Sequence, residues 1–205
     1  MNYQVFRERF SKFTCFSVEQ VLAAFPDFNC GNYRQWVLHG YIKRLRRGWY
    51  AFSDALHIPC VCDYFAGKIY SPSYLSCEYV MARTGLIPES VVQLTSVTTL
   101  KTASFKNEFG EFFYRSIKPE LMFGYDVQVI NGTLPVNVAS PHKAFCDFLY
   151  LNHRYNTLED MEGLRLDEDT LSELVSGGVL ERTAERFRSS ALMRRIGLAR
   201  KAYAI

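Results

Sequence analysis

The chain has 205 residues, of which 48% are hydrophobic and 15% aromatic, and its formal net charge at pH 7 is +3. So apolar a composition excludes an intrinsically disordered protein, and so small a net charge excludes a polycation. The charge is nevertheless uneven, because residues 1–60 hold eight Lys and Arg against four Asp and Glu.

Residues 17–53 predict two helices followed by a short β-hairpin. Ser17 and Gln20 have the spacing of a capping box at a helix start. The apolar residues that follow recur on one helical face until Pro26, which cannot continue a helix. This order of elements is that of a winged helix-turn-helix, so the segment predicts DNA binding before any enzyme chemistry is considered.

The second helix is predicted to begin near Asn29 or Asn32 and to end at Gly40, which can adopt the left-handed conformation. Its predicted apolar side consists of Tyr33, Trp36 and Val37. The opposite side is polar, which is common in helices, but Arg can pair with guanine and Gln or Asn with adenine. The predicted base-contacting residues are Asn32, Arg34, Gln35 and His39.

Four cations lie in the first strand and turn of the hairpin, beside the second helix: Lys43, Arg44, Arg46 and Arg47. A wing of this kind lies along DNA phosphates, and each neutralised phosphate strengthens binding at low salt. A solvated charge run is the usual interpretation of such a cluster, but the adjoining helix and the aromatic strand at 49–52 favour a wing. We therefore predict that residues 1–56 contact DNA, with a purely structural or protein-binding use as the alternative.

The remainder, residues 57–205, is predicted to form an α+β domain. Its predicted parts are a helical connector at 57–90, a small antiparallel sheet at 91–139 and a helical region at 140–205. Ser73 or Ser76 can cap a helix that includes Leu75 and ends at Gly85.

Two local sequence signals predict a hairpin and a helix in the second half of this domain. Asn131 and Gly132 lie between two alternating runs, which is the strongest short hairpin signal. A helix is predicted over 140–151 with Pro141 in its first turn.

Polar residues near the start of that helix, His142, Lys143 and Asp147, have the residue types of an acid–base site. We interpret their spacing as the polar side of an amphipathic helix. The chain contains no D/E-x-K pair, no phosphate-binding glycine loop, no G-x-S-x-G and no H-E-x-x-H. We therefore expect that the protein is not an enzyme.

The tail is predicted to form helices at 157–163, 167–176 and 179–203, the last broken near Ser189 or Gly197. It holds a second group of cations, which either contact nucleic acid or pair with the acidic residues of 159–173. These cations are Arg182, Arg186, Arg194, Arg195, Arg200 and Lys201.

The chain shows no secretory signal and no stretch near the ~20 apolar residues of a membrane-spanning helix. Its six cysteines include no C-x-x-C pair, and its four histidines offer no zinc-ligand spacing. We expect a cytoplasmic protein with reduced thiols, no metal and no cofactor.

Four segments, in this order, resemble the AbiEi-type antitoxins of bacterial type IV toxin–antitoxin systems and their relatives among predicted transcriptional regulators. The segments are RRGWYAF, KIYSPSYLSCEYVMARTGLIPE (68–89), VVQLTSVTTLKT and VASPHKAFCDFLYL (138–151), and the resemblance covers roughly residues 5–151. It implies a winged helix that binds operator DNA and represses its own operon. It also implies a carboxyl-terminal domain that opposes a nucleotidyltransferase-type toxin, without requiring a stable complex.

The DNA-binding role implied by the resemblance falls on Asn32, Arg34, Gln35, Lys43, Arg44, Arg46 and Arg47. The resemblance assigns no role to any particular residue of the carboxyl-terminal domain. Two alternatives remain open: a winged-helix module that holds a protein partner such as the toxin, and a stand-alone regulator. Inverted-repeat operators would favour a homodimer on DNA.

Overall fold

A computed structural model describes residues 1–205 and has an α+β fold, with 46% of the residues helical and 21% in strands. The helices are α1 (Tyr3–Phe10), α2 (Val18–Ala24), α3 (Gly31–Leu38), η1 (Ser53–His57), α4 (Val61–Ile69), α5 (Cys77–Arg83), η2 (Pro119–Leu121), α6 (Pro141–Leu151), α7 (Leu158–Glu162), α8 (Glu168–Val175), η3 (Ser176–Gly178), α9 (Val179–Glu185) and α10 (Ser190–Ala202). The strands are β1 (Cys15–Ser17), β2 (Ile42–Arg46), β3 (Trp49–Phe52), β4 (Ser73–Leu75), β5 (Leu94–Thr98), β6 (Ala103–Asn107), β7 (Gly110–Ser116), β8 (Tyr125–Ile130) and β9 (Leu134–Ala139).

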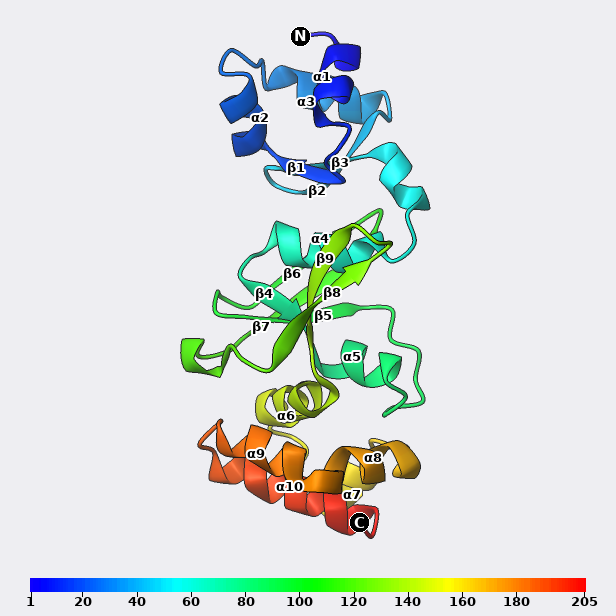
Figure 1. Ribbon diagram of the computed structural model, residues 1–205, viewed down its shortest axis with the longest axis vertical. Coiled ribbons are helices and arrows are strands. Elements are labelled where there is room, and N and C mark those ends of the chain that lie inside the picture. Colours follow the sequence, from blue (N-terminus) through cyan, green and yellow to red (C-terminus); the bar gives the residue numbers. More distant parts are fainter.

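The amino-terminal part of the chain folds as α1, α2 and α3 against a three-stranded sheet of order β1-β3-β2 (Figure 1). Its core is aromatic, because Phe6 of α1 contacts the rings of Phe16, Trp36 and Phe52 at centroid distances of 4.6–6.0 Å. The nine residues of this core form a cluster of their own. Helix α1 lies upstream of the first predicted element.

Local signals of the sequence are confirmed in this part. The capping box joins Ser17 and Gln20, and Gly40 follows α3 with φ 70°. The side-chain oxygen of Asn29 accepts a hydrogen bond from the N–H of Gly31 at 2.8 Å, so α3 begins near Asn29 and not at Asn32.

The other face of the three-stranded sheet packs against the rest of the molecule. Leu45 of β2 and Ala51 of β3 belong to the main core of 43 buried residues. The side-chain amide of Asn107, at the end of β6, donates to the carbonyl of Leu45 at 2.8 Å. The hairpin β2–β3 is therefore held between the amino-terminal helices and the main body, as Figure 1 shows. The predicted domain boundary after residue 56 stays a prediction.

The main body contains a six-stranded mixed sheet of order β6-β7-β5-β4-β9-β8. Strands β5 and β7 are parallel, as are β4 and β9, whereas the other neighbours are antiparallel. The predicted small antiparallel sheet is therefore correct for three of the five strand pairs, and the two parallel pairs were not predicted. The parallel pair β4–β9 arises because β4 enters the centre of the sheet from the segment predicted to be helical. Leu75 lies in this strand, opposite Ser96 and Val138, and α5 begins only after Ser76.

Three further predictions are confirmed. Asn131 and Gly132 form the β8–β9 turn, both with positive φ. Helix α6 begins at Pro141 beneath the sheet. The tail folds as α7–α10 in a layer below α6, and the last helical region is broken at Ser189 (Figure 1).

Gly124 marks a close approach between the chain before β8 and helix α6. A Cβ atom at this position would lie 3.2 Å from Cγ of Lys143, and Gly124 has φ +70°. Gly132 has the same φ, but a Cβ atom there would meet no other atom within 4 Å. Replacing Gly132 by alanine therefore costs only the strain of a left-handed backbone, about 1–2 kcal/mol. Gly124→Ala should therefore lower the free energy of unfolding by at least about 1 kcal/mol more than Gly132→Ala, measured by urea denaturation. Equal losses would show that α6 yields to the added methyl group.

Candidate nucleic-acid interface

The outer face of α3 presents three of the four predicted base-contacting side chains. Arg34, Gln35 and His39 are exposed. The helix is fixed from its inner side, where the ring of Tyr33 stacks on that of Tyr50 in β3 at 4.6 Å and an interplanar angle of 3°. The three polar groups are thus held on a supported helix and remain free to meet a ligand.

Asn32 is placed differently from these three residues. Its side chain is half-buried, and the Nδ2 atom is buried without a hydrogen-bond partner. Its proposed contact with a base therefore requires a change of rotamer.

Arg44 and Arg47 are the free cations of the hairpin. Both are exposed, and neither belongs to an ion pair of the protein. Arg44 lies opposite Tyr50 on β3, and side chains of such cross-strand partners project from the same face of a sheet. Because Tyr50 stacks on α3, Arg44 projects on the same side of the sheet as that helix.

Lys43 and Arg46 instead point toward the main body. Nζ of Lys43 lies 2.6 Å from a carboxylate oxygen of Glu108, in the β6–β7 turn. Arg46 donates to the carbonyl of Ile69 at 2.6 Å, and its guanidinium lies over an aromatic ring of β6, 5.1 Å from the centroid of Phe105. The pairing of β2 with β3 shifts between Arg44 and Arg46, as in a β-bulge, and turns Arg46 away from α3. Their predicted role toward DNA stays a prediction, but both head groups are engaged within the protein.

Apolar side chains near the end of α3 form a feature that the sequence pattern did not indicate. Leu38 is 71% exposed, and Tyr41 is 44% exposed. Val37, predicted to lie inward, is also exposed. We name Val37, Leu38 and Tyr41 the α3 apolar patch. Such side chains can contact a protein partner.

The second predicted basic surface is only partly exposed. Arg182, Arg186 and Arg194 lie at the surface, but Arg195 is 6% exposed and donates to the carbonyl of Leu149 at 3.3 Å. Arg195 projects from the inward side of α10 toward α6, so its assignment to a surface was wrong.

The proposed pairing of the tail arginines with the acidic residues of 159–173 is also wrong. The ion pair in the tail joins Arg200 to Glu181 at 2.9 Å, and the remaining arginines of α9 and α10 have no carboxylate partner. The acidic residues and the basic helix therefore do not neutralise each other.

Lys143 and Asp147 do not lie on the polar side of α6, as their spacing predicted, because both side chains are 0% exposed and form an ion pair. Asp147 accepts hydrogen bonds from the hydroxyls of Tyr74 at 2.9 Å and Ser76 at 2.8 Å. Nζ of Lys143 also donates to the Tyr74 hydroxyl at 2.9 Å. The four residues form a closed buried network, and we name it the Lys143–Asp147 network.

Burial dominates the electrostatics of this network. It raises the pKa of the Asp147 carboxyl and lowers the pKa of the Lys143 ammonium, while their mutual attraction opposes both shifts. The rings of Phe123 and Phe187 lie 4.8 and 4.5 Å from Nζ of Lys143. These rings and the absence of solvent exposure fit a structural pair and not a group that meets substrate.

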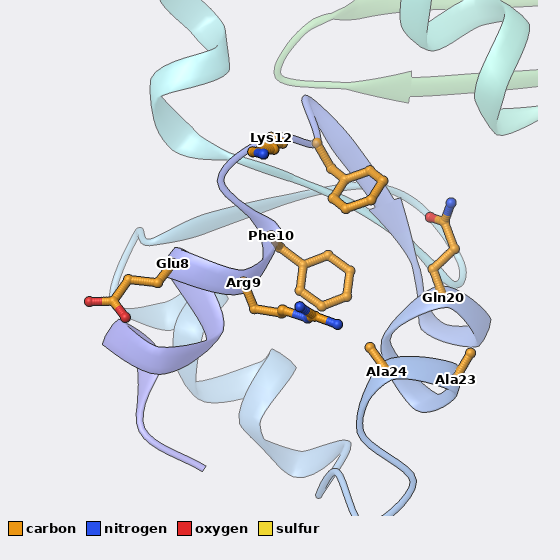
Figure 2. Close-up of a pocket in the computed structure, with 8 residues that line it drawn as sticks. Glu8, Arg9, Phe10, Lys12, Gln20, Ala23 and Ala24 are labelled. Atoms are coloured by element: carbon orange, nitrogen blue, oxygen red, sulfur yellow. The ribbon is translucent and has the colours of Figure 1, made fainter.

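A hollow of about 680 Å³ lies between α1 and α2 and includes Arg9, Phe10 and Ala24 in its lining. Figure 2 shows the side chains of Arg9 and Phe10 between these helices. None of the predicted DNA-contacting residues lines it, so this hollow is separate from the interface on α3 and the hairpin. No three His, Cys, Asp or Glu side chains are grouped so that they could hold a metal ion, and no helix is long and apolar enough to cross a membrane.

Comparison with protein-family models gives no match, and no curated protein matches the chain. The resemblance to AbiEi-type antitoxins therefore stays a prediction.

Proposed function

We propose that residues 1–56 form a winged helix-turn-helix that binds double-stranded DNA. The order α1-β1-α2-α3-β2-β3, with β3 between β1 and β2, supports this proposal. The observation that carries it is the combination of exposed Arg34 and Gln35 on α3 with the unpaired cations Arg44 and Arg47 of the adjoining hairpin.

In this proposal α3 enters the major groove. Arg34 can donate two hydrogen bonds to guanine, and Gln35 can pair with adenine through both atoms of its amide. Arg44 and Arg47 contact phosphates and set the register of the protein on DNA without reading sequence. Lys43 and Arg46 support the hairpin from the side of the main body.

We further propose that the protein is a transcriptional autorepressor and the antitoxin of a type IV system, paired with a nucleotidyltransferase-type toxin. This part rests on the resemblance of residues 68–89 and 138–151. These segments include β4, α5 and α6, and all four residues of the Lys143–Asp147 network belong to them. The segments that carry the resemblance are thus largely core segments, and the protein acts in this proposal without catalysis, metal or cofactor.

The α3 apolar patch favours the alternative of a protein-interaction module. Three exposed apolar side chains lie close together in the sequence, and such a group can meet a protein partner such as the toxin. The neighbouring reading frame distinguishes an antitoxin from a stand-alone regulator.

A reporter gene behind the protein's own upstream region tests the proposal. The protein should repress this reporter several-fold, and Arg34→Ala/Gln35→Ala should relieve the repression because base contacts are lost. Leu38→Ala, on the same helix, is the control and should retain most of the repression. Full repression by the Arg34→Ala/Gln35→Ala variant would contradict the proposed role of α3. A different pair of results would favour the interaction module. In that case the unaltered protein would capture the toxin but not repress the reporter, and Leu38→Ala would abolish the capture.

A further inference from the structure

A second basic site lies in the main body, on the side where η2 meets the α9–α10 connection (Figure 1). It is a hollow of about 430 Å³, within the size range of small-molecule sites. Three cations line it, with one acidic and three largely apolar neighbours. The cations are Lys118, Arg186 and Arg188, and the neighbours are Glu120, Leu121, Tyr150 and Phe187.

The charge of this hollow is not balanced by the protein. Lys118, Arg186 and Arg188 together with Glu120 give it a net charge of +2 (three cations minus one carboxylate). None of these four groups belongs to an ion pair, although cations elsewhere, such as Arg7 with Asp54, find carboxylates. Three cations that line one hollow without an ion-pair partner repel one another, and an anion bound there reduces that repulsion.

The hollow is also held in shape by packing. The guanidinium of Arg186 lies 3.5 Å from the centroid of the Phe123 ring, which fixes it by a cation–π contact. The half-buried ring of Tyr150 lies 5.2 Å from the buried ring of Phe187, which supports it as an aromatic wall of the hollow. The backbone N–H of Arg188 donates to the carbonyl of Glu185 at 3.0 Å, so the connection that carries Arg188 is tied to the end of α9.

We propose that this hollow binds a nucleotide. Lys118, Arg186 and Arg188 hold its phosphate, and the base lies against the half-buried ring of Tyr150. Arginine is suited to phosphate because its planar guanidinium donates two parallel hydrogen bonds, and bases stack on aromatic rings without regard to sequence. The nucleotide is either free or part of a single-stranded nucleic acid, since both present the same groups.

This site is independent of the DNA interface proposed above. It lies at the opposite end of the molecule from α3, near α9 and α10 (Figure 1). Failure of one proposal therefore leaves the other standing, and variants of each site serve as controls for the other.

Calorimetric titration of the full chain with ATP, inorganic phosphate and a short single-stranded oligonucleotide tests the proposal. ATP should bind saturably, and Lys118→Ala/Arg188→Ala should weaken it by at least about tenfold, because two charge-assisted contacts are lost. Neither side chain makes a hydrogen bond or ion pair within the protein, so the temperature of thermal unfolding should not fall. Arg182→Ala removes an exposed arginine of α9 that does not line the hollow, and this variant should bind ATP as the unaltered protein does.

The outcomes separate the possible ligands. Tighter binding of ATP than of the oligonucleotide assigns a free nucleotide, and the reverse assigns a nucleic-acid strand; both support the site. Inorganic phosphate that binds as tightly as ATP would overturn the part assigned to the aromatic wall. No saturable binding of any probe, or equal losses in Arg182→Ala and Lys118→Ala/Arg188→Ala, would overturn the site itself. Arg44→Ala/Arg47→Ala should leave ATP binding unchanged.

Discussion

Replacing Asp147 by alanine should lower the free energy of unfolding by about 3–5 kcal/mol, because it leaves the Lys143 ammonium buried without its partner. Both side chains have no solvent exposure, so water cannot replace the lost carboxylate. The hydroxyls of Tyr74 and Ser76 lose their acceptor in the same variant. For a protein of ordinary stability this is a large fraction of the total, about 5–15 kcal/mol. Urea denaturation followed by circular dichroism measures the loss.

A neutral version of the pair is the matched control. In Lys143→Met/Asp147→Asn, a carboxamide oxygen still accepts hydrogen bonds from the two hydroxyls, and no charge remains in the core. Replacement of a buried ion pair by neutral groups is often tolerated, so this variant should lose much less than Asp147→Ala. A loss below about 1 kcal/mol for Asp147→Ala would show that Lys143 reaches solvent or loses its proton easily.

Arg44→Ala/Arg47→Ala should weaken binding to operator DNA by roughly 100-fold near 0.1 M salt, since two charge-assisted phosphate contacts disappear. The slope of log K against log salt concentration should become shallower by about 2, one for each phosphate no longer neutralised. Neither arginine belongs to an ion pair, so the fold should persist. Fluorescence anisotropy with labelled duplex measures both quantities.

Lys43→Ala/Arg46→Ala changes the net charge by the same amount and is the control for that variant. These side chains contact Glu108 and the Ile69 carbonyl, so their loss should reduce stability and leave the salt slope nearly unchanged. If this variant flattened the slope as much as Arg44→Ala/Arg47→Ala, the two sides of the hairpin would contribute equally. The division of the four cations proposed above would then be wrong.

Features of the fold that depend on a few neighbouring residues could be predicted from the sequence. Ser17 and Gln20 form their capping box within one helical turn. Asn131 and Gly132 adopt positive φ in a three-residue turn, and Pro141 opens α6. In each case the physical cause lies within about four residues of the feature, so a linear pattern contains it.

Features that depend on distant partners could not be predicted. Leu75 lies in a three-residue strand whose neighbours are β5 and β9. A strand this short has too few residues to show the alternation of apolar and polar side chains that predicts a strand. Lys143 and Asp147 look like exposed residues because the hydroxyl that satisfies Asp147 comes from Ser76, 71 positions earlier. Polar residues can be buried where such partners exist, and the partners are not visible in the local pattern.

The candidate sites show the same division. The exposure of Arg34 and Gln35 on α3 could be predicted from helical spacing, whereas the exposure of Val37 and the partial burial of Asn32 could not. The engagement of Lys43 by Glu108 could not, nor could the meeting of Lys118 with Arg188, because each joins segments more than 60 positions apart. The sequence shows that both regions are rich in cations but could not show which of these cations have partners within the protein.

The proposed function depends above all on selective binding of the protein's own upstream DNA by α3 and the β2–β3 hairpin. Its most direct test is a titration of the unaltered protein with that DNA across a salt series, beside an unrelated duplex of equal length. We expect tight binding to the upstream DNA that weakens as salt rises and exceeds binding to the unrelated duplex by at least about 10³-fold. Equal, weak binding to both duplexes would contradict the proposal and leave partner capture through the α3 apolar patch as the better explanation.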